Sequence, residues 1–394
     1  MDALTEDLIK PQVLRWARER ARVPLEKLAH KLQKKPEQID AWEKGLAAPT
    51  LNQAQRLADV LHVPLGYLFL PSPPEERIPL PDFRTIAGAQ PDRPSADFID
   101  LLDDVVVKQQ WYREFLLSEG RRPLDFVGRF TAASAVIDVA DDVREKLRVN
   151  SAMRDRCRNW EEFLRTLIQN AEAIGILVMR SGVVEGNTHR PLSVDEFRGF
   201  AISDRIAPLV FLNGRDAQTA QIFTLAHELV HLWIGASGIS NENLRQPTGG
   251  ANNATERFCN ATAAEILVPA AEFDSVWEGN SVDDNIRRIG TQYRVSTVVA
   301  LRRAYDLSKI GWDQFVSYYK REDQKFKVKD AVKKQGGSYF NNVIARNSAV
   351  LTTTVVKGAL EGKILYRDAA QLLNVSVPSI HKIADRLEKR ARPA

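Results

Sequence analysis

Two histidines and a glutamate lie inside the apolar segment FTLAHELVHLWIG, residues 223–235. His227 and His231 are four residues apart, so on a helix their rings project from one face, one turn apart. Two neutral imidazoles at this spacing can bind one zinc ion, and Glu228 then reaches the open position, where it can take a proton from a water attacking a carbonyl. A buried helix does not carry three ionisable groups without compensation, so the pattern predicts a catalytic Zn²⁺ site.

A catalytic zinc ion needs a third protein ligand. The downstream segment NATERFCNATAAEILVP offers two glutamates on a helix predicted over residues 254–267. Glu256 lies near the start of this helix, and Asn260, one turn later on the same face, can hydrogen-bond a metal ligand. Glu265 is nine residues after Glu256, which places it on the opposite side of the helix. We therefore predict Glu256 as the third ligand and Glu265 as a helix-end or ion-paired carboxylate.

These two segments together resemble the ImmA/IrrE metallopeptidases, over about residues 170–275. In that family a histidine pair and the first glutamate of an E-x-x-A-N-x-F-A-A-E-L-L-x-P segment hold zinc. The resemblance maps these ligands onto His227, His231 and Glu256, with Glu228 as the catalytic base. It implies a core similar to the thermolysin-like gluzincins, and family members often cleave a cognate transcriptional repressor.

The chain departs from the family pattern at two positions of the second segment. Cys259 stands where alanine is usual, and Thr262 stands where phenylalanine is usual. Both are packing positions, so the metal ligands are unaffected. A buried packing residue is the expected role of Cys259, with a redox switch as the alternative. His189, on a loop before the strands, is expected to be a surface residue, with polarisation of a substrate carbonyl as the alternative.

Short β-like runs at residues 174–179, 199–203 and 207–213 precede the histidine helix. Peptidases can bind a substrate as an extra strand along a sheet edge, through main-chain hydrogen bonds. The run at 207–213, APLVFLN, is predicted to be either such an edge or a covered core strand, and the sequence leaves both open.

Residues 10–70 form a separate helical segment, in which Pro36 opens a helix and Gly45 ends it. The order of five short helices resembles the Xre/lambda-repressor type of helix-turn-helix domain. By that resemblance the helix beginning at Pro36 enters the major groove, and Lys34 and Lys35 approach phosphates. The outward residues of this helix that we predict to face DNA are Glu37, Gln38, Ala41 and Lys44.

The same recognition segment is acidic, which argues against tight DNA binding. Glu37, Asp40 and Glu43 stand against the single Lys44, a poor match to a polyanion. A protein-docking or dimerisation module is therefore the alternative to DNA binding, and a homodimer is possible.

The C-terminal segment is basic and helical. Residues 320–394 carry 16 Lys and Arg against 7 Asp and Glu, although the net charge of the whole chain is only +4. Helices predicted at 366–373 and 378–387 flank a short turn, which indicates either a second helix-turn-helix or an extension of a helical bundle. A cluster of lysines suggests phosphate contact, with a solvated link as the alternative; its members are Lys325, Lys327, Lys329, Lys333 and Lys334.

The bulk composition indicates a multidomain globular protein of 394 residues, mainly α with a small β-sheet. Two cysteines, no apolar run of membrane-spanning length and no signal pattern favour a cytoplasmic protein that binds no membrane. Between residues 71 and 94 there are seven prolines, typical of a stiff connector. The predicted organisation is a helix-turn-helix domain at 1–70, a Pro-rich linker at 71–96, an α+β zincin-like peptidase domain at 97–318 and a basic helical domain at 319–394.

Two hypotheses follow. The first is a zinc-dependent endopeptidase fused to a DNA-binding domain, which regulates transcription by cleaving a partner repressor in a stress response or in mobile-element control. The second is a DNA-binding regulator or antitoxin whose peptidase-like domain binds a partner without proteolysis. Glu228 favours the first, because a structural metal site does not need a base beside it.

Overall fold

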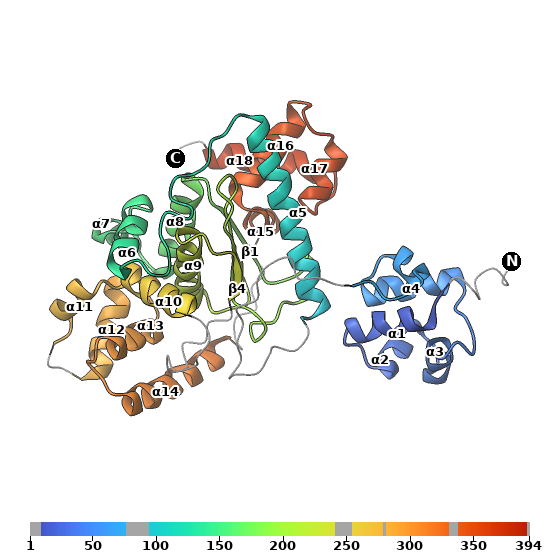
Figure 1. The fold of residues 1–394 in the computed structure, drawn as a ribbon, viewed down its shortest axis with the longest axis horizontal. Helices are drawn as coiled ribbons and strands as arrows, with labels where there is room; N and C mark the ends of the chain where they lie inside the picture. Colours follow the sequence, from blue (N-terminus) through green and yellow to red (C-terminus); the bar gives the residue numbers. More distant parts are fainter. Residues whose placement is uncertain (1–8, 76–93, 241–253, 279–280, 331–337, 392–394) are drawn as a thin grey trace. The chain divides into compact units, whose positions relative to one another are not determined.

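The fold is taken from a computed structural model, which describes residues 9–75, 94–240, 254–278, 281–330 and 338–391. The described residues form two compact units (Figure 1). The first contains residues 9–75 and 94–102, and the second contains the described residues from 103 onward. Helices dominate, and the four named strands form one small sheet, so the predicted fold class is confirmed.

The first unit is a bundle of short helices. Its elements are α1 (Pro11–Arg20), α2 (Leu25–Leu32), α3 (Pro36–Glu43), α4 (Leu51–Leu61) and the 3₁₀ helix η1 (Leu65–Phe69). Pro36 starts α3, and α2 and α4 end at residues in the left-handed region, Gln33 and His62. Thr50 and Gln53 form a capping box at the start of α4.

Apolar side chains from all of these helices meet in one core. Leu14, Leu28, Ile39, Trp42 and Leu57 are each at most 3% exposed and belong to the same cluster. Each helix buries only the face that carries these residues, because the intervening positions are polar. Ile39 and Trp42 thus hold α3 against the bundle and leave its other face outward.

The second unit is built from helices around the sheet (Figure 1). Helix α5 (Ala96–Ser118) has residues in both units. The others are α6 (Val136–Lys146), α7 (Ser151–Arg156), α8 (Trp160–Ala173), α9 (Gln218–Trp233), α10 (Ala254–Leu267), α11 (Ala270–Val276), α12 (Val282–Tyr293), α13 (Thr297–Asp306), α14 (Trp312–Asp330), α15 (Tyr339–Asn347), α16 (Ala349–Leu360), α17 (Tyr366–Leu372) and α18 (Ser379–Ala391).

The sheet has the strand order β1-β3-β2-β4. Its strands are β1 (Leu177–Ser181), β2 (Gly199–Ile202), β3 (Leu209–Asn213) and β4 (Gly238–Ser240). Strand β3 lies between β1, to which it is parallel, and β2, to which it is antiparallel, and every residue of β3 is buried. The run at 207–213 is therefore a covered core strand and not the edge. On the side of β2, the outermost described strand is β4.

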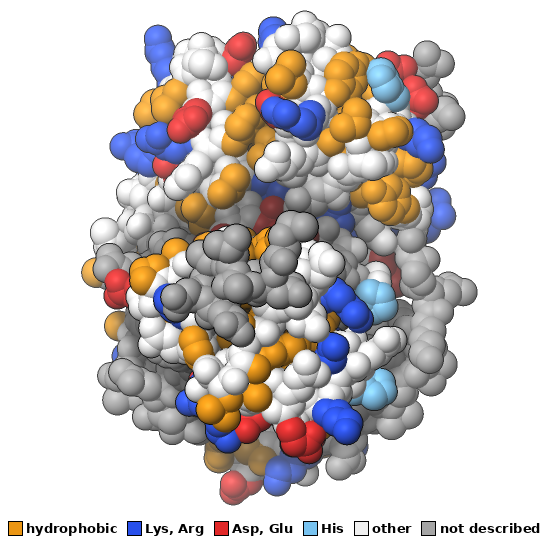
Figure 2. Space-filling model, turned by 90° about the vertical axis from the view of Figure 1, so that its right-hand side faces the viewer, with side chains coloured by type: hydrophobic (Ala, Val, Ile, Leu, Met, Phe, Trp, Pro, Cys, Tyr) orange, Lys and Arg blue, Asp and Glu red, His pale blue; other side chains and the backbone are white. Residues whose placement is uncertain are grey.

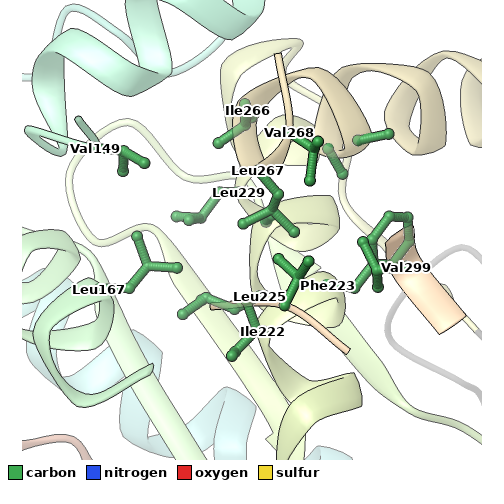
Figure 3. Close-up of a cluster of buried hydrophobic side chains, with 14 of the residues drawn as sticks. Val149, Leu167, Ile222, Phe223, Leu225, Leu229, Ile266, Leu267, Val268 and Val299 are labelled. Carbon is green, nitrogen blue, oxygen red and sulfur yellow. The ribbon is translucent and has the colours of Figure 1, made fainter. Parts of the chain in front are cut away.

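Helix α9 runs through the interior of the second unit. All residues from Gln221 to Trp233 are buried, as expected for a helix that is apolar on nearly every side. Figure 3 shows Leu225 and Leu229 of α9 in one buried cluster with Ile266 and Leu267 of α10. Packing of α9 against α10 brings the histidine segment and the downstream glutamate segment together.

Helices α15 to α18 belong to the same compact unit as the sheet, and α15 packs beside β1. The predicted boundary between residues 318 and 319 falls inside the continuous helix α14. Helices α15 and α16 both pack against β1, at the edge of the sheet, and a separate domain at residues 319–394 stays a prediction. No helix among the described residues has the length and apolarity needed to cross a bilayer.

Candidate metal centre and DNA-facing helix

His227, His231 and Glu256 converge from two helices. Nε2 of His227 lies 3.1 Å from Nε2 of His231 and 3.1 Å from Oε2 of Glu256. Oε1 of Glu256 lies 3.2 Å from Nε2 of His231. Both imidazoles are fully buried, and the Glu256 side chain is 13% exposed. Three side chains of types that bind metals thus point at one small region. Glu256 of α10 follows His231 of α9 by 25 positions along the chain and His227 by 29.

These separations fit a tetrahedral zinc ion. Ligand atoms about 2.0–2.1 Å from a common ion at tetrahedral angles lie about 3.3–3.4 Å apart. The separation of the two Nε2 atoms is only slightly shorter than this, and each Nε2 atom lies at a similar distance from one of the two oxygens of Glu256. Two imidazoles and one carboxylate are also the donor set of catalytic zinc sites that keep one position open. The residues present therefore fit the metal that the sequence predicts.

Burial and mutual contact shift the pKa values of His231 and Glu256. Burial lowers the pKa of His231 below its ordinary value, and the nearby Glu256 offsets only part of this effect. Burial alone would raise the pKa of Glu256, but the two histidines outweigh it and lower the pKa well below the usual range. Neutral imidazoles and an ionised carboxylate are the forms that bind a divalent cation.

Asn260 lies one turn after Glu256 on α10, and its Oδ1 is 3.1 Å from Nδ1 of His227. An amide oxygen accepts a hydrogen bond, so this contact places the proton of the neutral ring on Nδ1. Nε2 of His227 is then left with a lone pair that faces His231 and Glu256. The contact is the one expected for a residue that orients a metal ligand.

Glu228 lies beside the histidine pair on α9. It is fully buried, and at about 100° per residue it lies about 100° around the helix axis from His227 and about 60° from His231. Thr224, one turn before Glu228, is 5% exposed, and both side chains lie close to Gly199 at the start of β2. Gly199 was not among the predicted site residues, although a glycine inside a β-like run often marks a close approach of another segment.

Glu265 does not take part in the cluster. Its carboxylate pairs with the Arg303 guanidinium, and its Oε1 accepts a hydrogen bond from the backbone N–H of Ala270. Arg303 also donates to the carbonyl of Val268, so the pair ties α13 to the end of α10. This is the ion-paired role expected for the second glutamate.

The other two residues considered in this region, Cys259 and His189, are not members of the His227, His231 and Glu256 cluster. Cys259 is fully buried in the core cluster of the second unit. His189 is exposed on the loop between β1 and β2.

In the first unit, α3 presents most of the predicted DNA-facing residues outward. Lys35 immediately precedes the helix, and Glu37, Gln38 and Lys44 are exposed. Lys34 and Ala41 are half-buried. Base contacts and phosphate contacts by these residues remain predictions.

The exposed surface of α3 carries less negative charge than the number of acidic residues in its sequence indicates. Glu43 is 5% exposed, and its two carboxylate oxygens accept hydrogen bonds from Arg18 at 2.6 and 2.8 Å. Asp40 pairs with Lys44 at 2.6 Å. Counting Glu43 against DNA binding was therefore wrong, because its charge is neutralised inside the bundle.

The C-terminal helices carry charges of both signs. Their exposed basic residues are Lys357, Lys363, Arg367, Lys382 and Arg386, and their exposed acidic residues are Glu361, Asp368, Asp385 and Glu388. Figure 2 shows the same mixture of basic, acidic and apolar side chains on the face that it draws. Lys325, Lys327 and Lys329 lie at the end of α14, where side chains are not described, and Lys333 and Lys334 lie outside the described residues. A second helix-turn-helix at α17 and α18 stays a prediction.

Three segments of the chain match known protein families. Residues 171–305 match the IrrE N-terminal-like domain, a peptidase family, and residues 14–68 match a helix-turn-helix family. Residues 347–386 match a domain of unknown function, DUF8813. No curated protein and no solved structure matched the chain. The peptidase match spans the metal cluster, and the helix-turn-helix match spans α3. The chain thus carries a segment similar to helix-turn-helix domains and a segment similar to the IrrE N-terminal-like domain, the two resemblances that its motifs predicted.

Proposed function

We propose that the protein is a zinc-dependent endopeptidase that regulates transcription by cleaving a partner repressor. The observation that carries the proposal is the convergence of His227, His231 and Glu256 in the interior, with Glu228 on the adjacent face of α9. The family match at residues 171–305 supports a peptidase, and the helix-turn-helix match supports a role at DNA.

Each of these residues has a defined task in the proposal. His227, His231 and Glu256 would hold the metal, and Asn260 would keep the His227 ring in the tautomer that binds it. When bound, zinc acidifies a water molecule and polarises the scissile carbonyl. Glu228 accepts the proton of the attacking water and passes it to the leaving amine, in a site where burial keeps bulk water away.

The sheet suggests how a substrate is held. Strand β4 pairs with β2 so that Ser240 lies opposite Gly199, and Gly199 contacts the Glu228 side chain closely. In the proposal an extended peptide adds to β4, the neighbour of the strand that lies against Glu228, and its main chain is held by hydrogen bonds. Strand β4 would then take the substrate-binding role that the sequence left open for residues 207–213.

The test uses the full chain and a proteome-derived peptide library with blocked amino termini. We expect new amino termini, detected by mass spectrometry, with the zinc-loaded protein but not after chelation of the metal. Glu228→Gln should keep one zinc per chain and lose cleavage by about 100-fold or more. Glu278→Gln, at an exposed position, is the matched control and should cleave like the wild type.

Two outcomes would reject the proposal. If no new termini form at any zinc load, the domain binds a partner without proteolysis. If Glu228→Gln cleaves as fast as the wild type, Glu228 is not the base. A positive library result also gives the sequence preference around the cleaved bond, with which a repressor containing that sequence can then be tested directly.

A further inference from the structure

We propose that Gly199 is a positioning residue for Glu228: the absence of a side chain at this point of β2 lets the carboxylate occupy its catalytic place. The inference rests on the proposed function, because it assumes that Glu228 is the base. It goes further by assigning a role to a residue of β2, outside the proposed metal ligands and the base.

The backbone of Gly199 does not require glycine. Its φ lies outside the left-handed region, and it pairs in register with Leu212 of β3 and with Ser240 of β4. Any residue can adopt this extended conformation. The reason for glycine at this position must therefore be space.

Side chains of α9 and the backbone of β3 fill the space that a side chain at Gly199 would need. A Cβ on Gly199 would lie 2.7 Å from Cγ2 of Thr224, 3.0 Å from Oε1 of Glu228 and 3.0 Å from the carbonyl oxygen of Phe211. Thr224 and Glu228 are one turn apart and present the same face of α9 to β2. The strand backbone is thus the wall against which the Glu228 carboxylate rests.

A methyl group at this wall would move the carboxylate by a few tenths of an ångström. The Thr224 methyl group would also have to give way, because 2.7 Å is too close for two carbon atoms. A general base must lie within hydrogen-bonding reach of the proton it takes, and small displacements of a catalytic group cost rate steeply. Metal binding should be much less affected, because none of the three atoms nearest to that Cβ belongs to His227, His231 or Glu256.

The experiment separates displacement of Glu228 from general loss of packing. Gly199→Ala introduces all three close contacts, whereas Gly199→Ala with Thr224→Ser removes the methyl group that clashes most and leaves the contacts with Glu228 and with the Phe211 carbonyl oxygen. Thr224→Ser alone is the reference for the double variant. Gly311→Ala is the matched control, since a Cβ there meets nothing within 4 Å and its φ is not left-handed.

The measurements are zinc per chain, melting temperature, and kcat and KM on a peptide identified from the library. We expect Gly199→Ala to lower kcat about tenfold with KM and zinc content unchanged. The double variant should regain melting temperature relative to Gly199→Ala but keep a kcat about tenfold below Thr224→Ser. A crystal structure of the double variant should show the Glu228 carboxylate displaced.

The results that would overturn this inference differ from the results that would reject the proposed function. A kcat of the double variant equal to that of Thr224→Ser would overturn the inference, as would a wild-type kcat for Gly199→Ala or an unmoved carboxylate. If Glu228→Gln itself cleaves normally, the proposed function fails instead. If Gly199→Ala does not fold, the double variant alone decides.

Discussion

Asn260 Oδ1 and His227 Nδ1 lie 3.1 Å apart, so a residue of α10 fixes the proton position on a histidine ring of α9. The same helix supplies Glu256 one turn earlier. Two side chains of α10 therefore contact the histidine pair: Glu256 on the side of the proposed metal, and Asn260 on the far side of the His227 ring.

Removing this contact should weaken metal binding. We expect Asn260→Ala to lower zinc affinity by about 10–100-fold, because the His227 ring loses the acceptor that orients it. Asn260→Asp keeps an oxygen acceptor and should stay near the wild type. Chelator competition measures both, and equal affinities for the alanine and aspartate variants would show that the contact is incidental.

Removing the carboxylate ligand should have a larger effect. Glu256→Gln is expected to lower zinc affinity by more than about 100-fold, beyond the range seen for residues that only orient a ligand. Elemental analysis of the purified chain measures the zinc that remains. A full complement of zinc in this variant would mean that the metal is held by other groups.

The second glutamate of α10 should affect stability and not metal content. Glu265→Ala leaves the Arg303 charge buried without its partner, and such losses cost about 3–5 kcal/mol. Thermal unfolding of the zinc-loaded protein should show a clearly lower melting temperature, while zinc per chain stays at the wild-type value. Loss of zinc without loss of stability would contradict these separate roles of Glu256 and Glu265.

Zinc affinity should be insensitive to mild acidification. Burial lowers the pKa of His231, so its ring stays neutral below the pH at which an ordinary histidine becomes protonated. Protons therefore compete with zinc only at lower pH, and the apparent affinity should be flat from about pH 8 down through about pH 6.5. A fall in affinity that begins above this range would show that the ring titrates like an exposed histidine.

DNA binding by the first unit should depend on the lysines before α3. If Lys34 and Lys35 contact phosphates, Lys34→Ala with Lys35→Ala should reduce the slope of log affinity against log salt by about 2 on a random-sequence duplex. Lys309→Ala with Lys357→Ala, at exposed positions of the other unit, serves as the control. Equal slopes for the two double variants would place the phosphate contacts elsewhere.

The sequence alone predicted the residues of the candidate site, because their pattern depends on local periodicity. Spacing of four residues put His227 and His231 on one face of a helix, and half-turn geometry separated Glu256 from Glu265. The helix predicted for residues 254–267 is α10 as the structure has it. The helix-turn-helix segment could also be predicted from the sequence, because proline and glycine mark its turns.

Only the tertiary structure decided which segments meet. It placed residues 207–213 inside the sheet, joined α15 to α18 to the peptidase unit, and buried Glu43 against Arg18. It also brought Gly199 against Glu228, although 29 positions separate them. Strand order, domain packing and such close approaches depend on contacts between residues distant along the chain, which local periodicity does not encode.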